Sequence, residues 1–273
     1  METLTIDYEI DMNDVECKEI LDVNSKTGTD VMKGIWRYET VCVKKIDIKH
    51  KNEVFILCKC IHPKICQFLG AHCTHDSIYI LFEFMDNGNL KEFLKNNIVN
   101  SKQRLKMMID IAVGLHYLHN RKPQSVIHRD LKPENILISK SGDAKIADFG
   151  ISKMMTTTST IEEIIQHSGE VGTCLWMAPE ILKKEKYNYK SDIFSFGLIC
   201  YYIWTGALPY AEQSLQSIQL MYKRYTDDLS LNTTMVDHPE LAEFICTCIE
   251  PDYQKRHNSN KCIQILKNIY QTI

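Results

Sequence analysis

The segment from residue 126 to residue 138 constrains this chain of 273 residues more than any other part of it. A polar cluster lies there between two apolar runs, and the segment reads Val126-Ile127-His128-Arg129-Asp130-Leu131-Lys132-Pro133-Glu134-Asn135-Ile136-Leu137-Ile138. The apolar runs predict short buried strands, so we expect the cluster on a tight loop fixed to a packed scaffold. Catalytic groups are commonly presented on such loops.

Three side chains of the loop indicate a particular chemistry. Asp130 can act as a base, Lys132 supplies a cation, and Asn135 offers a carboxamide oxygen. Together these groups can steer a hydroxyl, neutralise a phosphate and hold a metal ion. The loop therefore favours phosphoryl transfer.

The loop resembles the catalytic loop of a protein kinase, whose pattern H-R-D-x-x-x-x-N is matched from His128 to Asn135. The resemblance implies that Asp130 accepts the proton of the substrate hydroxyl, that Asn135 binds Mg²⁺, and that Lys132 meets the γ-phosphate of ATP. A lysine at the place of Lys132 is typical of serine/threonine kinases. The resemblance thus implies Ser or Thr hydroxyls of protein substrates as acceptors.

Further matches follow in the family's order. Ala144 to Gly150 carries the D-F-G motif, which implies that Asp148 binds Mg²⁺, or Mn²⁺ in its place. Gly172 to Glu180 ends in A-P-E and resembles the activation-segment end of the tyrosine-kinase-like group, whose members include serine/threonine kinases. By the same resemblance, Asp192 is a buried acid that supports the catalytic loop through backbone amides, and Arg256 pairs with Glu180.

The amino-terminal part resembles the nucleotide-binding half of a kinase. Val41 to Lys44 resembles the V-A-I-K strand, which implies that Lys44 contacts the α- and β-phosphates of ATP. A helix-like stretch from Asn52 to Leu57 contains Glu53, the implied partner of Lys44.

The apolar stretch from Ile78 to Met85 resembles the strand that leads to a kinase hinge. Phe82 is then the bulky residue at the back of the pocket, and backbone groups of Glu83 and Met85 meet adenine. An ordinary core strand that turns at Asp86 to Gly88 is the alternative.

The glycine-rich loop is where the chain departs from the family. With Val31 as the last residue of G-x-G-x-x-G-x-V, the glycine positions hold Asn24, Lys26 and Thr29. Val23 and Val31 flank this loop and are implied to contact the nucleotide. Two interpretations stay open, because Lys26 can replace amide contacts with charge, or the segment can be a plain hairpin with a polar tip.

The expected fold class is α+β, in a two-lobed protein-kinase-like fold. One kinase domain is expected over residues 9–271, with a small β-rich lobe with one helix at about 9–85 and a larger helical lobe at about 86–271. Apolar residues at helical spacing predict helices over 90–94 and 105–119, an apolar run predicts a buried helix over 193–204, and an amphipathic helix is expected over 262–270.

The expected function is that of an ATP-dependent protein serine/threonine kinase. The alternative is a pseudokinase scaffold that binds partners with weak or no phosphate transfer, because the glycine-rich loop is degraded. A small-molecule kinase is disfavoured, since Gly172 to Glu180 resembles a segment that shapes a protein-substrate site.

Composition bears on partners and compartment. The formal net charge is -3, so the chain lacks the overall basic field expected of a nucleic-acid binder. The longest apolar run, Ile193 to Trp204, is shorter than the ~20 residues that span a bilayer, so no membrane span is expected. Eleven scattered cysteines and an acidic amino terminus predict a reducing, cytoplasmic compartment.

Three local expectations complete the analysis. Ser191 is placed to cap the helix that contains Asp192. His116 and His119 are expected on a helix surface or at its cap, and not as a metal pair. Arg129 is implied to bind a phosphate on the activation segment, at one of residues 156–160 or at Ser168.

Overall fold

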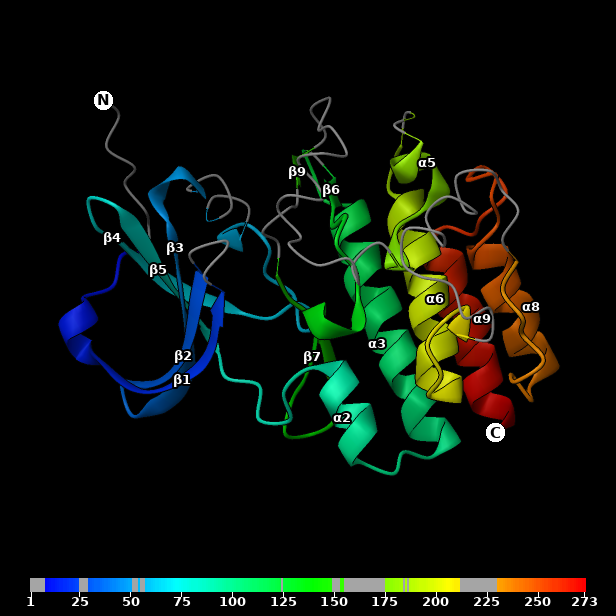
Figure 1. Ribbon diagram of the computed structural model, residues 1–273, viewed down its shortest axis with the longest axis horizontal. Coiled ribbons are helices and arrows are strands. Elements are labelled where there is room, and N and C mark those ends of the chain that lie inside the picture. The colour runs from blue at the N-terminus through cyan, green and yellow to red at the C-terminus, as the bar shows by residue number, and fades with distance from the viewer. Residues whose placement is uncertain are drawn as a thin grey trace.

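The computed structural model describes residues 8–24, 29–50, 54, 57–123, 125–148, 153–154, 175–183, 185, 187–211 and 230–273. Within these residues the chain forms two lobes, one built mainly from strands and one mainly from helices (Figure 1). Residues up to about 85 supply the strand lobe, and the carboxy terminus lies in the helical lobe.

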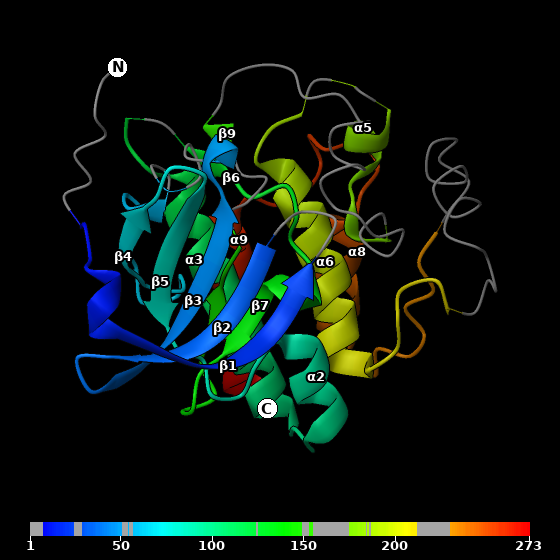
Figure 2. The ribbon, with the colours of Figure 1, turned by 60° about the vertical axis from the view of Figure 1, so that its left-hand side comes forward.

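The strand lobe contains a five-stranded antiparallel sheet in the order β1-β2-β3-β5-β4 (Figure 2). Its strands are β1 (Val15–Asn24), β2 (Thr29–Trp36), β3 (Glu39–Asp47), β4 (Phe68–Cys73) and β5 (Ser77–Glu83). Two 3₁₀ helices, η1 (Met12–Asp14) and η2 (Ile48–His50), lie before β1 and after β3.

Alternation along β3 divides the sheet into two faces, as expected for a strand with side chains of period two. Val41 and Val43 are fully buried and pack with Ile10 and Leu81 in a cluster that covers one face. The alternate residues of β3 therefore lie on the opposite face, where Cys42 is paired in register with Phe82 of β5.

The helical lobe is organised around long helices that run side by side (Figure 1). Its helices are α2 (Leu90–Asn96), α3 (Ser101–His119), α5 (Pro179–Leu182), α6 (Lys190–Thr205), α8 (Pro239–Cys248) and α9 (Ser259–Thr272). Short strands and one 3₁₀ helix connect them, namely β6 (Val126–Ile127), η3 (Pro133–Asn135), β7 (Ile136–Ile138), β8 (Ala144–Ile146) and β9 (Lys153–Met154).

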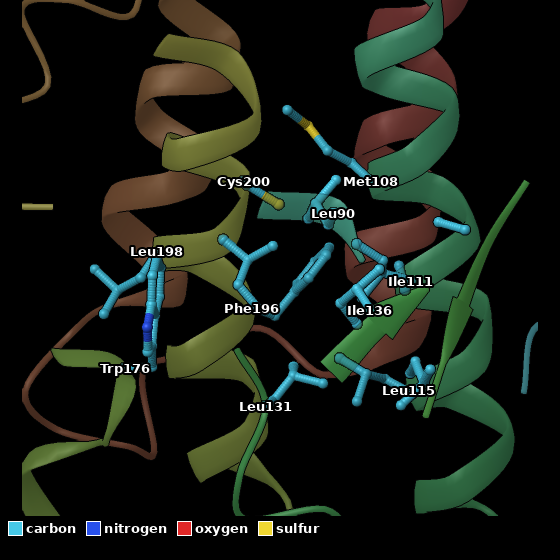
Figure 3. Packing of buried hydrophobic residues seen from close by; sticks show 14 of the residues in the cluster. Leu90, Met108, Ile111, Leu115, Leu131, Ile136, Trp176, Phe196, Leu198 and Cys200 are labelled. Carbon is cyan, nitrogen blue, oxygen red and sulfur yellow. The ribbon is translucent and has the colours of Figure 1, made fainter. Parts of the chain in front are cut away.

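The core of the helical lobe reaches directly beneath the polar loop. Leu131, between Asp130 and Lys132, has an exposed fraction of 1%. It belongs to the same buried cluster as Phe196 of α6 and Leu115 of α3 (Figure 3). Burying one leucine side chain stabilises by about 2 kcal/mol, so this contact fixes the loop to the scaffold.

The two-lobed α+β fold predicted from the sequence is confirmed. The helices predicted over 90–94, 105–119, 193–204 and 262–270 are present with slightly longer bounds, whereas β5 ends at Glu83, two residues before the predicted end at Met85. Of the helix expected over Asn52–Leu57, the structure describes Val54 and Leu57, and both are helical. Glu53 lies outside the described residues. The domain bounds of 9–271 stay a prediction.

Two local expectations were wrong. Tyr189 precedes α6 without a side-chain cap, and Ser191 lies inside the helix with its hydroxyl donating to the Asn188 carbonyl at 2.8 Å. His119 is neither on the surface nor a cap, because it is buried at the end of α3. The two errors have different causes: α6 begins one residue before Ser191, whereas His119 is buried by its contact with Asp192, which is distant in the sequence.

None of the described helices is long and apolar enough to cross a membrane.

Candidate active site

The polar loop brings its three predicted residues together. The Lys132 Nζ lies 3.1 Å from the Asp130 Oδ2. The side-chain NH₂ of Asn135 donates to the same oxygen at 3.0 Å and to the backbone carbonyl of Asp130 at 2.7 Å. β6 and β7 hold the two ends of the loop, as the apolar runs predicted.

The carboxylate of Asp130 is largely removed from water. Its side chain is 11% exposed, and its Oδ1 is buried with no hydrogen-bond partner in the part of the chain that the structure describes. Burial raises the pKa of Asp130, and the neighbouring Lys132 opposes this rise. A desolvated carboxylate with a raised pKa is a stronger base, which suits it to accept a proton from a hydroxyl.

Asp192 supports this loop from α6. One carboxylate oxygen accepts from the backbone amide of His128 and the other from that of Arg129, both at 2.9 Å. His119 lies 2.9 Å from the same carboxylate. Burial opposes the ionisation of Asp192, but the hydrogen bond from His119 and the nearby positive charge outweigh it and lower its pKa.

The backbone is strained at two points of the site. Arg129 has a φ of 70° and Asp148 a φ of 56°, both in the left-handed region that non-glycine residues avoid. Such conformations persist where the surroundings hold them, and the amide of Arg129 is held by Asp192. Within the site, the two strained residues are the one that precedes Asp130 and the one predicted to bind the metal ion.

Asn135 and Asp148 are linked by their backbones. The amide of Ala147 donates to the Asn135 carbonyl at 2.9 Å, which brings Asp148 beside the polar loop. The Asp148 Oδ1 is also 2.8 Å from the Lys44 Nζ, so strand β3 meets the same place. Lys44 and Asp148, predicted to contact the phosphates and the metal, therefore lie in contact.

The donors at this place fit a hard divalent cation. The NH₂ of Asn135 is directed at the Asp130 carbonyl, so its Oδ1 is the atom left to face a ligand. Asp148 adds a carboxylate that is 44% exposed. Oxygen ligands of this kind are those that Mg²⁺ and Mn²⁺ prefer. Asn135 and Asp148 would hold the ion, which supplies positive charge beside the phosphates of a nucleotide.

Beside the phosphate region the two lobes enclose an apolar cluster. It contains Cys66, Met85 and Ala147, with Phe82 and Leu137 packed against it. Phe82, expected at the back of the pocket, and Met85, expected to meet adenine, thus lie in one cluster with β7 and the residue before Asp148. The backbone amide of Glu83 donates to the Gln67 carbonyl at 3.0 Å, so its carbonyl is the group that a base could contact.

The remaining predicted nucleotide contacts lie on the hairpin of β1 and β2. Val23 pairs with Asp30 and is 57% exposed, while Val31 pairs with Lys44 of β3. The register joins Asn24 to Thr29, so the two strands pair up to a four-residue tip. Lys26 in this tip lies outside the described residues, and the choice between a phosphate cation and a plain hairpin stays open.

Several features of the site escaped the sequence analysis. Glu83 pairs with Lys145 of β8, whose Nζ lies 2.6 and 2.8 Å from the two carboxylate oxygens. Lys33 lies over the ring of Phe84 with 4.7 Å between Nζ and centroid. The alternation of β3 could have indicated Cys42, whose thiol faces the Phe82 side; burial raises its pKa to about 11.

The two charged residues at the far end of the site behave as the resemblance implied. Glu180 of α5 and Arg256 form a buried pair with two short contacts, of 2.6 and 2.8 Å.

Arg129, which precedes Asp130, is buried against Tyr187, at 4.9 Å from ring centroid to guanidinium. Among the described residues, its Nε and Nη1 have no hydrogen-bond partner although they are buried, which is costly for a cation unless a ligand supplies one.

A β lobe and a helical lobe that join at a lysine, two carboxylates and an asparagine define a phosphoryl-transfer fold of the kinase type. The chain belongs to the protein kinase domain family, which it matches over residues 24–268. The resemblance to a kinase drawn from the sequence is therefore confirmed.

Three similar proteins come from Arabidopsis thaliana. Serine/threonine-protein kinase VIK is 30% identical over 284 residues, which cover 98% of this chain and 63% of that protein. Serine/threonine-protein kinase 12 is 35% identical over 218 residues, 76% of this chain and 46% of that protein. Serine/threonine/tyrosine-protein kinase HT1 is 30% identical over 254 residues, 87% of this chain and 62% of that protein. The chain thus spans less than two thirds of these relatives.

Proposed function

We propose that the chain is an ATP-dependent protein serine/threonine kinase in which Asp130 is the base. The observation that carries the proposal is the arrangement of Asp130 with Lys132 at 3.1 Å and Asn135 at 3.0 Å, beside the contact of Lys44 with Asp148. This arrangement supports the proposal, because an in-line transfer of a phosphoryl group needs a base, cations and oxygen donors around one point.

Each residue has a distinct role in this proposal. Asp130 orients the acceptor hydroxyl and takes its proton, and Lys132 stabilises the charge on the transferring phosphate. Lys44 holds the α- and β-phosphates, and Asn135 and Asp148 hold Mg²⁺ or Mn²⁺. Phe82, Glu83 and Met85, with Val23 and Val31 opposite, form the adenine site, and Glu53 is the partner of Lys44.

The acceptor is proposed to be Ser or Thr in a protein. Lys132 supports it, and so do the names of the relatives, although one of them is also named for tyrosine. The net charge of -3 favours protein over nucleic acid as the partner. A reducing, cytoplasmic compartment is supported by the described cysteines, all of which are free thiols.

Metal-dependent nucleotide binding is the first test. With Mg²⁺-ATP at about 100 times its Kd, the free energy of unfolding should rise by about 2.7 kcal/mol, measured as a thermal shift. Asp148→Asn should lose most of the stabilisation that depends on the metal ion, and Lys44→Met should weaken nucleotide binding.

The acceptor is tested separately. Phosphoamino-acid analysis of the labelled product should find phosphoserine or phosphothreonine. No shift at millimolar Mg²⁺-ATP, or phosphotyrosine alone, contradicts the proposal.

Phosphorylation of the activation segment is proposed to complete the site, because Arg129 has nitrogens that need an anion. The expected acceptors, residues 156–160 and Ser168, lie outside the described residues. Mass spectrometry of the active protein should find a phosphate at one of them. If all are unmodified and their alanine variants keep full activity, this regulation is wrong.

A further inference from the structure

The residues that precede η1 are tied along the edge of the sheet. We call residues Tyr8 to Ile10 the strap. Its central residue, Glu9, forms a parallel bridge to Ala71 of β4. The amide of Ile10 donates to the Ala71 carbonyl at 3.1 Å, and the amide of Ala71 donates to the Tyr8 carbonyl at 3.0 Å. The strap is therefore held by backbone hydrogen bonds as a short additional strand.

β4 is shaped to receive the strap. Its pairing with β5 shifts register between Phe68 and Gly70. A Cβ on Gly70 would lie 2.6 Å from the Ile10 Cγ2 and 2.9 Å from the Tyr8 carbonyl, so the approach is possible only because residue 70 is glycine. Ile10 itself is 8% exposed. The strap thus has one defined position, directly beside Phe68.

Three aromatic rings connect this position to the nucleotide site. The ring of Tyr8 meets that of Phe68 edge to face, with centroids 5.8 Å apart and an interplanar angle of 89°. Phe68 meets Phe82 in the same manner, at 6.4 Å and 79°. Phe68 and Phe82 are also paired in register across β4 and β5, so their side chains lie on one face. The chain of contacts ends at the apolar cluster that contains Met85 and Ala147.

We propose that Tyr8 is a positioning residue for the nucleotide site, acting through Phe68 on the ring of Phe82. The inference rests on the proposed function, because it takes Phe82 as the back of the adenine site. Phe68 is only partly buried, so its ring can shift when its edge-to-face partner is lost, and the ring of Phe82 then loses the neighbour that fixes it. Tyr8 is 45% exposed, so truncating it removes little of the core.

The readout must report on Phe82 and not on the fold. ATP that carries a benzyl group on N6 extends the base toward a residue at the back of the site, so its affinity depends on where that ring lies. We compare the Kd of ATP with that of N6-benzyl-ATP in the full chain, by nucleotide-induced thermal shift with Mg²⁺. Binding is measured without phosphate transfer, so the result does not depend on catalytic activity.

Tyr8→Ala should shift the ratio of the two Kd values about two- to tenfold in favour of the bulky nucleotide, the range expected from losing one aromatic pair. Phe68→Leu should shift it in the same direction and serves if Tyr8→Ala does not fold. Tyr8→Phe keeps the ring and should leave the ratio unchanged. Met12→Ala is the matched control, because Met12 packs on the other face of the sheet.

An unchanged ratio in Tyr8→Ala and Phe68→Leu overturns the coupling and leaves the nucleotide site intact. An equal shift in Met12→Ala also overturns it, since a general loosening of the lobe then explains the effect. Wild-type protein that binds neither nucleotide overturns the proposed site and the coupling together.

Discussion

At the residue scale, the chemistry depends on how two carboxylates are treated differently by their surroundings. Asp192 is held ionised by His119 and by the amides of His128 and Arg129, and its pKa is lowered. Asp130 is desolvated with less compensation, and its pKa is raised. One acid is thus a fixed support for the loop, and the other is suited to proton transfer.

The charge of Lys132 limits the rise that burial causes in the pKa of Asp130. Asp130 must be ionised to accept a proton, so kcat falls as the pH drops through its pKa. Because Lys132 lowers that pKa against the effect of burial, Lys132→Met should move the acid limb of kcat to higher pH, besides lowering the plateau. The kcat–pH profile, measured with Lys140→Met as an exposed control, checks this. An acid limb that stays in place or moves to lower pH contradicts the assignment.

At the element scale, the turn that joins β2 to β3 is strained, because both of its residues have positive φ. Its register joins Trp36 to Glu39, so Arg37 and Tyr38 form a two-residue turn with φ of 49° and 70°. Turns of this shape need positive φ at both positions and favour Asn-Gly. The chain instead uses a charged and an aromatic residue, and the Arg37 guanidinium lies over Trp36 at 4.6 Å.

Tyr38→Gly should therefore stabilise the fold. Tyr38 is fully exposed, at 101%, so no packing is lost, and relief of the left-handed conformation should raise the free energy of unfolding by about 1 kcal/mol. That corresponds to a rise in Tm of about 2 °C in a protein of this size. Tyr38→Ala removes the same ring and keeps the strain, so it should give no rise. Equal Tm values for the two variants contradict the argument.

Elements with a strong local pattern were predictable from the sequence, whereas contacts between distant elements were predictable only where the family resemblance implied them, as for Glu180 with Arg256. The alternation of β3 and the helical spacing within α3 are local, and both were found. The catalytic loop was recognisable because its polar cluster is contiguous. The strap has only three residues and no period, and the Glu83–Lys145 pair joins residues 62 positions apart, so neither leaves a local signal.

At the scale of the whole molecule, a charge cluster joins the two lobes away from the nucleotide site. Lys64, which precedes β4, has its Nζ 2.7 Å from the Asp110 Oδ1 of α3 and 3.0 Å from the Asp143 Oδ1 in the turn between β7 and β8. Lys106 of α3 also pairs with Asp143. Hydrogen bonds from Lys106, Ser141 and Lys64 hold the pKa of Asp143 well below its usual range.

This cluster predicts how stability depends on pH. A carboxylate whose pKa is lowered by folding stabilises the native state above the unfolded pKa of about 3.9, and that contribution is lost as the pH falls below it. Asp143→Asn should therefore be less stable than wild type at pH 7, with a gap that narrows below about pH 4. Urea unfolding across this range measures the gap, and Glu39→Gln, an exposed acid on β3, is the control. A gap that is constant with pH contradicts the role of Asp143.

The central claim is that Asp130 makes this chain an enzyme and not a scaffold. The most direct measurement is the initial rate of labelled phosphate transfer from Mg²⁺-ATP to Ser and Thr protein substrates, for wild type and Asp130→Asn, with nucleotide binding measured on the same samples. Asp130→Asn should lower the rate by at least about 100-fold and leave the Kd for Mg²⁺-ATP nearly unchanged, because the carboxylate acts on the acceptor. Wild-type protein that carries its activation-segment phosphate and transfers no more label than Asp130→Asn would contradict the account and establish the scaffold in its place.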